Sequence, residues 1–207
     1  MKFISIHIPK TGGKTFLGIL SKLYNGKLCH DKKDIPHTGK WGYPKSYMKY
    51  DVIHGHFIYD KYIHLNVPYI VWLRDPVKRL ISQYFFQKVR GCSRRKGNDV
   101  HQVRLIREHM NIVQFAQMKA NIMTDVYLCG RPLESFAFVG ILERFDDSLK
   151  LFEKFTGKKI NFSYPIQNVQ GVKPYISPGQ KKQIAAHNKK DIAYYNNALR
   201  RFDREKI

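Results

Sequence analysis

Phe3-Ile-Ser-Ile-His-Ile-Pro-Lys-Thr-Gly-Gly-Lys-Thr-Phe16 joins an apolar run, a glycine turn and the start of a helical pattern in one short segment. The β-branched and aromatic residues up to Ile8 predict a buried strand, which Pro9 ends. Gly12 and Gly13 allow the backbone to turn tightly, and a helical apolar pattern begins at Phe16. The segment therefore predicts a strand, a turn and a helix whose N-terminus carries the glycines.

This turn has the chemistry of an anion-binding site. Free backbone N–H groups at a helix N-terminus, together with the helix dipole, favour a negatively charged ligand. Lys10 and Lys14 add positive charge, and Thr11 and Thr15 add hydroxyl donors. The alternative is an ordinary strand-to-helix turn, which does not require lysines and threonines around paired glycines. We therefore expect residues 10–15 to bind a phosphate-like group.

Two kinds of phosphate loop can be compared with this turn. In the nucleotide-triphosphate pattern G-x-x-x-x-G-K-[ST], the second half matches Gly13-Lys14-Thr15, but Ile8 stands where the first glycine belongs. By contrast, His7-Ile-Pro-Lys-Thr-Gly-Gly13 closely resembles the 5′-phosphosulfate loop of the carbohydrate sulfotransferases, which use 3′-phosphoadenosine 5′-phosphosulfate (PAPS) as sulfuryl donor. Lys14 stands where that family more often has a small hydroxyl residue. The resemblance implies that Lys10 lies near the transferred group and that this set binds the donor: Lys10, Thr11, Gly12, Gly13, Lys14 and Thr15.

Length and charge limit the alternatives. With 207 residues, 43% of them hydrophobic, the chain is long enough for one well-buried core, so we expect a single domain over residues 1–207. Its 37 lysines and arginines against 16 acidic residues give a formal charge of +21. Such a charge implies an anionic partner, and nucleic acid, acidic lipid, an anionic cofactor and a sulfated or carboxylated glycan all fit that description.

The cysteines and the apolar runs bear on the compartment. Cys29, Cys92 and Cys129 are the only cysteines and include no C-x-x-C spacing, which suggests neither a disulfide framework nor a zinc site. The N-terminal apolar run is too short for a signal peptide, and no run approaches membrane-spanning length. These features predict a soluble, cytoplasmic protein.

Strand and helix patterns alternate along the rest of the chain. We expect strands at 51–57, 67–73 and 136–142, and helices at 76–89 and 100–120, from an Asp146 cap to Gly157, and from a Ser177 cap through Phe202. Residues 25–50 have little periodicity and predict an irregular connection. The alternation favours an α/β fold of P-loop-like, three-layer type, with a central, mostly parallel sheet flanked by helices.

A second motif, Arg74-Asp-Pro-Val-Lys-Arg-Leu-Ile-Ser82, follows the strand predicted at 67–73. Asp75 suits an N-cap and Pro76 a first helical position, so Arg74 should lie at the carboxyl edge of the sheet, where α/β proteins bind ligands. Taken alone, Arg74 could simply neutralise Asp75. Taken with the first loop, the stretch is similar to the 3′-phosphate motif of sulfotransferases, which implies that Arg74 and Ser82 hold the ribose 3′-phosphate. A guanidinium fork suits a phosphate dianion.

The third motif is His54-Gly-His56. Residues two apart on a strand face the same side, so both imidazoles can point into one cleft. A metal site would need a third ligand, and none stands at typical spacing, so we expect no metal. Two interpretations remain: core histidines satisfied by hydrogen bonds, or a base that takes the proton of an attacking alcohol.

With Arg74 to Ser82 following it, the His-Gly-His element looks like that of the uronyl 2-O-sulfotransferase branch, where it supplies the base. The resemblance implies that His56 is the first candidate for the base and His54 the second, and their spacing does not separate them. The likeness continues more weakly beyond residue 100, where it implies that residues 168–173 close over the adenosine phosphates and that Lys173 touches the cofactor. A solvated lysine is the alternative there.

Together these motifs predict in-line transfer of a sulfuryl group from PAPS to a hydroxyl of a carbohydrate. Adenosine 3′,5′-bisphosphate is the product, and His56 and Lys10 assist the transfer without a metal. The charge favours an acidic glycan as acceptor, with no need for nucleic acid. Two alternatives remain open: a P-loop kinase of a small metabolite, and a non-catalytic binder of polyanions or nucleic acid.

Overall fold

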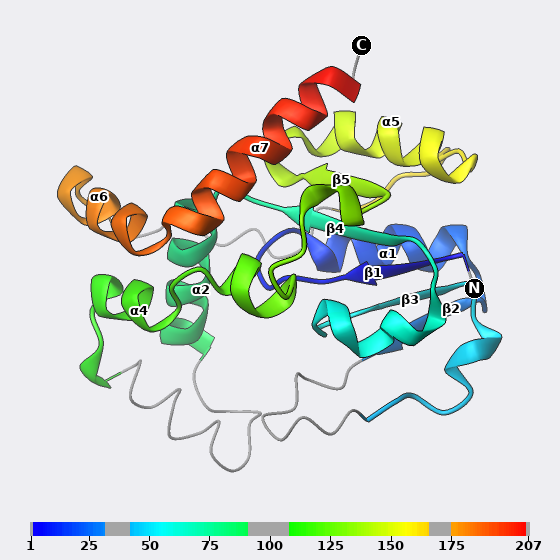
Figure 1. The fold of residues 1–207 in the computed structure, drawn as a ribbon, viewed down its shortest axis with the longest axis horizontal. Coiled ribbons are helices and arrows are strands. Elements are labelled where there is room, and N and C mark those ends of the chain that lie inside the picture. Colours follow the sequence, from blue (N-terminus) through cyan, green and yellow to red (C-terminus); the bar gives the residue numbers. More distant parts are fainter. Residues whose placement is uncertain (1, 32–41, 91–107, 166–174, 206–207) are drawn as a thin grey trace.

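The structure is a computed structural model that describes residues 2–31, 42–90, 108–165 and 175–205 (Figure 1). Its centre is a five-stranded sheet in the order β2-β3-β1-β4-β5. All four strand pairs that the structure describes are parallel. The strands are β1 Phe3–Ile6, β2 Leu28–Asp31, β3 Val52–Gly55, β4 Tyr69–Leu73 and β5 Phe138–Ile141.

Helices cover both faces of the sheet, as the continuous apolar strands require. The α-helices are α1 Gly13–Leu23, α2 Pro76–Arg90, α4 Ile112–Met118, α5 Phe145–Thr156, α6 Pro178–His187 and α7 Lys189–Glu205. A π-helix, η3, spans Ile122–Tyr127, and 3₁₀ turns span Tyr47–Lys49, Tyr59–Leu65, Leu133–Ser135 and Leu142–Arg144.

The strand side chains alternate between two cores. Phe3 of β1 and Trp72 of β4 pack with α1 and α5 on one face. Ile4 and Ile6 of β1 pack on the other face with η3 and with Phe202 of α7. Three layers result, which confirms the predicted α/β fold with a parallel sheet between helices.

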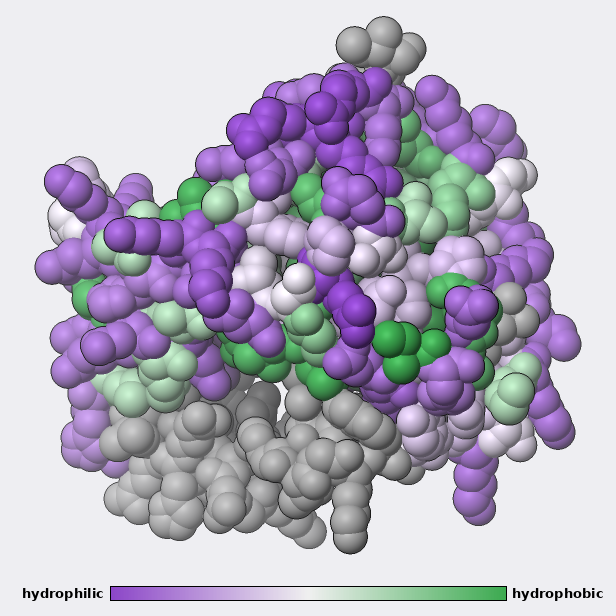
Figure 2. Space-filling view, viewed as in Figure 1, coloured by the Kyte–Doolittle hydropathy of each residue, from purple (hydrophilic) through white to green (hydrophobic). Residues whose placement is uncertain are grey.

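The C-terminal helices begin with the predicted cap. Ser177 Oγ accepts the Gln180 N–H at 3.2 Å, and the Gln180 side chain accepts the Ser177 N–H at 3.0 Å. In α7, Tyr195, Ala198 and Phe202 are buried. Hydrophilic residues cover the outer side of α7 (Figure 2). No helix in the described ranges is both long and apolar enough to cross a bilayer.

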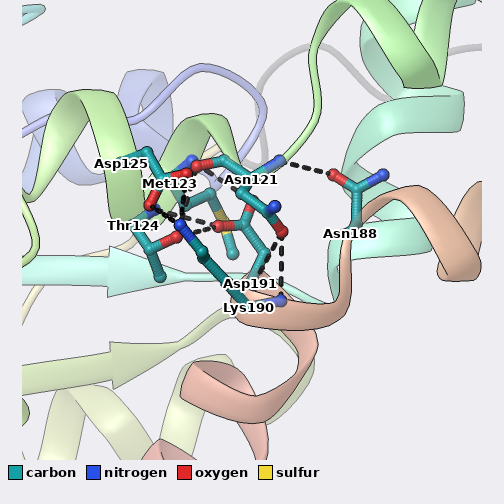
Figure 3. Close-up of polar contacts among 7 residues, drawn as sticks. All are labelled: Asn121, Met123, Thr124, Asp125, Asn188, Lys190 and Asp191. Carbon is teal, nitrogen blue, oxygen red and sulfur yellow. Dashed lines mark hydrogen bonds and ion pairs between the residues drawn. The ribbon is translucent and has the colours of Figure 1, made fainter.

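The prediction of one continuous C-terminal helix is wrong. The helix breaks at Asn188, where α6 ends and α7 starts. The buried Asn188 amide donates to the Ile184 carbonyl at 2.8 Å and accepts the Asn121 N–H at 3.1 Å. The Asn188 side chain thus stabilises the helix break through hydrogen bonds. One of them connects the break to Asn121, which is far away in sequence (Figure 3).

Asp191, in the first turn of α7, anchors this junction to η3 (Figure 3). Its buried carboxylate accepts the Thr124 N–H at 2.9 Å, the Thr124 hydroxyl at 2.8 Å and the Met123 N–H at 3.2 Å. Asn121 accepts the N–H groups of Lys190 and Asp191 at 3.1 and 3.3 Å. We call Asn121, Met123, Thr124, Asn188 and Asp191 the C-terminal anchor.

Other predicted boundaries also need correction. The segment 25–50, expected to be irregular, contains the edge strand β2. This strand ends in the polar residues His30 and Asp31, so it has no apolar run by which the sequence would predict a strand. Asp146 lies in the first turn of α5, whose N-cap position is Arg144. Of the helix expected at 100–120, residues before 108 lie outside the described ranges, and α4 begins only after Asn111, which caps it.

Candidate functional site

The candidate site lies where the connections of the sheet diverge. From β1 the chain passes through α1 toward β2 and β3, whereas from β4 it continues through α2 toward β5, and β1 and β4 are neighbours. Loops at such a point leave a crevice beyond the carboxyl ends of the strands. The two loops here are residues 7–12 and residues 74–75, which carry the first two predicted motifs.

The two glycines of the first loop are needed for different reasons. Gly12 has a φ of 85°, and a Cβ there would lie 2.7 Å from Leu142 Cδ1. At Gly13 the obstacle is space, because a Cβ would lie 2.0 Å from two atoms of the His7 ring. Lys10 also adopts a left-handed conformation, with a φ of 73°. For a side-chain-bearing residue this costs about 1–2 kcal/mol, which the surrounding structure must offset.

The loop leads directly into α1. Gly12, its N-cap residue, makes no side-chain capping bond within the described chain, and the first turn holds no acidic residue. A helix N-terminus without acidic residues in its first turn favours an anion, because its leading N–H groups and the helix dipole are positive. The Thr11 hydroxyl donates to the Ile8 carbonyl at 2.8 Å and so closes the loop. Lys14 is exposed and Thr15 is buried.

Arg74 connects the second motif to the first. Its Nη1 donates to the Lys10 carbonyl at 3.1 Å, while its Nε lies 3.9 Å from Glu143 Oε1. This Nε is buried and has no hydrogen-bond partner among the described residues. Burial lowers the pKa of Arg74, and the charges of Glu143 and Asp75 oppose that effect.

The acidic residues next to Arg74, Glu143 and Asp75, are themselves held by hydrogen bonds. Glu143 accepts the Asp75 N–H at 3.3 Å and the Tyr195 hydroxyl at 2.8 Å. Asp75 caps α2 as predicted, because its Oδ1 accepts the Lys78 N–H at 2.8 Å. Ser82 lies further along α2 and is buried. The Lys10 ammonium also reaches this helix, 4.3 Å from the centroid of the Phe86 ring.

His54 and His56 lie in different environments. His54 is 1% exposed, and its Nδ1 is 2.8 Å from the Ser5 hydroxyl. Its Nε2 is buried beside the Gly13 backbone and, within the described ranges, makes no hydrogen bond of normal geometry. Burial lowers the pKa of His54 to about 3, with a further contribution from His30 and His56. His54 is thus held neutral in the interior.

His56 stands just beyond the end of β3 and is only partly buried. Its Nδ1 lies 2.8 Å from the His7 carbonyl oxygen. A carbonyl only accepts, so Nδ1 carries the proton. In the neutral ring the lone pair that takes up a proton is then on Nε2. The expectation that both imidazoles share one cleft is therefore not met by the two environments.

Two further histidines complete a cluster that the sequence did not predict. The His7 ring stacks on His56 at 4.0 Å between centroids and on His54 at 5.2 Å. The His30 ring of β2 is 6.2 Å from that of His54. No signal in the sequence pointed to His7 as part of this cluster, because its place depends on the parallel register of β1 and β3, which its N–H continues by donating to the Gly55 carbonyl at 2.8 Å. We call His7, His30, His54 and His56 the histidine cluster.

The described residues contain no group of three or more histidine, cysteine or acidic side chains placed to hold a metal ion. In the histidine cluster the rings stack instead of converging on one point. Lys173, predicted to touch the cofactor, lies outside the described residues, as does the rest of 166–174.

Comparison with known proteins gives a family and a fold. The sequence model of the sulfotransferase family matches residues 1–205. A crystal structure of a sulfotransferase from Alicyclobacillus acidocaldarius is similar with a TM-score of 0.55 and 15% identity, over 96% of this chain and 95% of that one. The mouse sulfotransferase SULT7A1 complexed with PAP gives a TM-score of 0.43 and 12% identity, over 89% and 62% of the two chains. No curated protein gives a significant match.

Proposed function

This chain belongs to the sulfotransferase family, and on that premise we propose that it transfers a sulfuryl group from PAPS to a hydroxyl of an acidic carbohydrate, with His56 as general base. One observation carries the proposal. The Arg74 guanidinium bonds to the Lys10 carbonyl, so the loop suited to a 5′-phosphosulfate and the motif suited to a 3′-phosphate lie side by side. PAPS carries both groups, whereas ATP lacks a 3′-phosphate.

The residues present fit such a donor. The N-terminus of α1 has no side-chain cap within the described chain, and residues 10–15 surround it. The buried Nε of Arg74, without a hydrogen-bond partner in the described ranges, is a donor for which a phosphate oxygen would be a suitable acceptor. We assign the 5′ end to Lys10 through Thr15, and the 3′-phosphate to Arg74 and Ser82. Lys173 is proposed as a further contact by family resemblance alone.

When bound, PAPS supplies the sulfuryl group and leaves as adenosine 3′,5′-bisphosphate. His56 would take the acceptor's proton on Nε2 as the hydroxyl oxygen forms its bond to sulfur. The His7 carbonyl would stabilise the resulting imidazolium, because it keeps its hydrogen bond from Nδ1. Lys10 and the first N–H groups of α1 would balance the charge that grows on the phosphate oxygen as its bond to sulfur breaks.

Two considerations separate His56 from His54 as base. A general base must reach the acceptor hydroxyl, and only His56 of the two is partly exposed. His54 is enclosed, and its Nδ1 is engaged with Ser5. We therefore assign His54 to the support of the site. The acidic character of the acceptor is proposed from the formal charge of +21.

The donor site can be tested by thermal unfolding with adenosine 3′,5′-bisphosphate and, separately, with ATP plus Mg²⁺. At about 100 times Kd a ligand adds about 2.7 kcal/mol to the stability. We expect a shift with the bisphosphate that Arg74→Ala reduces. A shift with ATP and Mg²⁺ alone would point to a kinase. No shift, with oligonucleotide binding that weakens steeply with salt, would point to a polyanion binder.

The reaction itself is tested with ³⁵S-labelled PAPS and matched acidic and neutral polysaccharides. We expect labelling of the acidic acceptors, lost in His56→Ala although bisphosphate binding persists. Labelling of neutral glycans alone would contradict the acidic acceptor. Full activity of His56→Ala would contradict the assignment of the base.

A further inference from the structure

His7 makes two different contacts with His56. Its ring stacks on the His56 ring, with centroids 4.0 Å apart and planes 24° apart. Its backbone carbonyl accepts the His56 Nδ1 proton at 2.8 Å. The stack limits rotation of the His56 ring, while the hydrogen bond selects its tautomer. One residue therefore restrains both properties on which proton transfer at Nε2 depends.

His7 is itself fixed from the other side. Its ring is 8% exposed and lies against Gly13, where even a Cβ would come within 2.0 Å of Nε2 and Cδ2. Its backbone is held in the sheet by the bond from its N–H to the Gly55 carbonyl at 2.8 Å. The His54 ring covers it at 5.2 Å. His7 thus acts as a rigid spacer between the first turn of α1 and the ring of His56.

The charges around His7 keep its ring neutral. Burial lowers its pKa well below the usual value of 6.5, and the titratable groups of the described residues that act on it lower it further. These groups are His54 in β3, His56 just after it, His30 on β2 and Lys14 on α1. A neutral neighbour does not oppose a positive charge on His56, whereas a protonated one at this distance would.

We propose that His7 is a positioning residue, whose stacked ring keeps the imidazole of His56 turned toward the His7 carbonyl, and so in the orientation and tautomer needed to accept the proton of the acceptor hydroxyl. This inference rests on the proposed function, in which His56 is the base. The simpler interpretation is that His7 only fills space beneath the loop. That interpretation does not require a second contact with the same imidazole.

The test compares His7→Ala, which removes the ring, with His7→Phe, which keeps a planar ring; both variants keep the backbone carbonyl. Misplaced catalytic groups lose rate by factors of up to about a hundred. We expect His7→Ala to lower kcat about tenfold to a hundredfold, and His7→Phe to stay within about threefold of the parent. His187→Ala, at the end of α6, serves as the matched histidine control.

Nitrogen NMR of histidine-labelled protein gives a readout that space filling alone would not move. We expect the His56 signals of the parent and of His7→Phe to show one tautomer with the proton on Nδ1. In His7→Ala the stack no longer holds the His56 ring, which can turn away from the His7 carbonyl, so we expect a mixture of tautomers. An unchanged His56 tautomer in His7→Ala, or an equal loss of kcat in both variants, would overturn the proposal.

The NMR comparison also tests the positioning role of His7 separately from the proposed sulfuryl transfer. If the parent transfers no sulfuryl group, the proposed function fails, yet the tautomer comparison still decides whether His7 positions His56. Bisphosphate binding and thermal unfolding of each variant show whether it is folded. If His7→Ala does not fold, the decision rests on His7→Phe and on His7→Leu, which fills the space without a planar ring and should lose the single tautomer.

Discussion

The C-terminal anchor and the candidate site both bury polar groups, but they satisfy them differently. In the anchor, Asp191 is fully buried and accepts three hydrogen bonds from Met123 and Thr124. In the site, the Nε2 of His54 and the Nε of Arg74 are buried with no hydrogen-bond partner in the described ranges. Most buried polar groups in folded proteins are paired. The anchor follows that rule and the site departs from it.

Under the proposed function, the difference separates groups that hold the fold from groups that a bound ligand would pair. A paired carboxylate at the α6–α7 junction contributes to stability, because its oxygens accept hydrogen bonds from within the chain. Arg74 donates from Nη1 but not from its buried Nε within the described ranges, which lowers stability and keeps one N–H donor available. Arg79 of α2 is fully buried. Burial lowers its pKa to about 10, and the charge of Asp191 in the anchor opposes that effect. Four changes would sharpen or break the comparison.

The largest effect is expected from Asp191→Ala. The change leaves the N–H groups of Met123 and Thr124 without their acceptor, whereas the Thr124 hydroxyl can still donate to the Asn121 carbonyl at 3.2 Å. Unsatisfied buried donors cost about 1–3 kcal/mol each. We expect the free energy of unfolding to fall by about 3 kcal/mol in urea titrations, with unchanged bisphosphate affinity in the folded protein. Asp203→Ala, exposed on the same helix, is the control. A loss below about 1 kcal/mol would mean that the anchor is not what holds the junction.

Gly13→Ala should act on binding. The new Cβ would meet the His7 ring at 2.0 Å, so the loop or the ring must move. We expect bisphosphate affinity to fall about a hundredfold by calorimetry, which corresponds to about 2.8 kcal/mol. Gly179→Ala, where the nearest atom to a Cβ is 3.9 Å away, is the control and should leave affinity unchanged. Equal affinities of both variants would show that the close approach of His7 to Gly13 does not shape the site.

Acid should destabilise the site through His54. Its pKa is lowered to about 3 in the folded protein, whereas an unfolded histidine has about 6.5, so the unfolded chain binds more protons between these values. Stability is therefore full above pH 6.5 and falls as the pH decreases toward 3. From pH 7 to 5 the loss from this residue is about 2 kcal/mol. Urea titrations at both pH values should show a smaller loss in His54→Asn, and equal losses would contradict the buried neutral state.

The smallest effect is expected from Ser177→Ala, which removes the N-cap of α6. Its hydroxyl oxygen accepts the Gln180 N–H at the start of α6. Loss of an N-cap costs about 1 kcal/mol. We expect Ser177→Ala to lower the thermal midpoint by a few degrees without changing kcat, and exposed Ser163→Ala to do neither. A change of kcat in Ser177→Ala would couple this end of the molecule to the site.

The parts of the fold that the sequence predicted are those governed by local chemistry. Proline after a strand, glycines in a turn and a capping aspartate or serine each act over a few residues, so the first loop, Asp75 and Ser177 were placed correctly. The parallel sheet followed from strands alternating with helices. The fold of a solved sulfotransferase agrees with it.

What the sequence did not predict depends on contacts between distant segments. The helix break at Asn188 is held by a bond from the Asn121 N–H, 67 residues away. His7 meets His56 across 49 residues because β1 and β3 pair in parallel. Alternation placed His54 and His56 on one side, but β3 ends at Gly55, so the pattern no longer applies to His56. Such features need the register, which a local pattern does not contain.

The central position of β1 has a consequence for biosynthesis. β1 is made before both of its neighbours, β3 and β4, and the Ser5–His54 contact spans 49 residues. At about 5–20 residues per second, a ribosome needs about 2–10 s to supply that partner. During this interval an apolar strand has two unpaired edges, which is the state most exposed to aggregation. Slow translation of residues 7–55 should therefore lower the yield of folded protein.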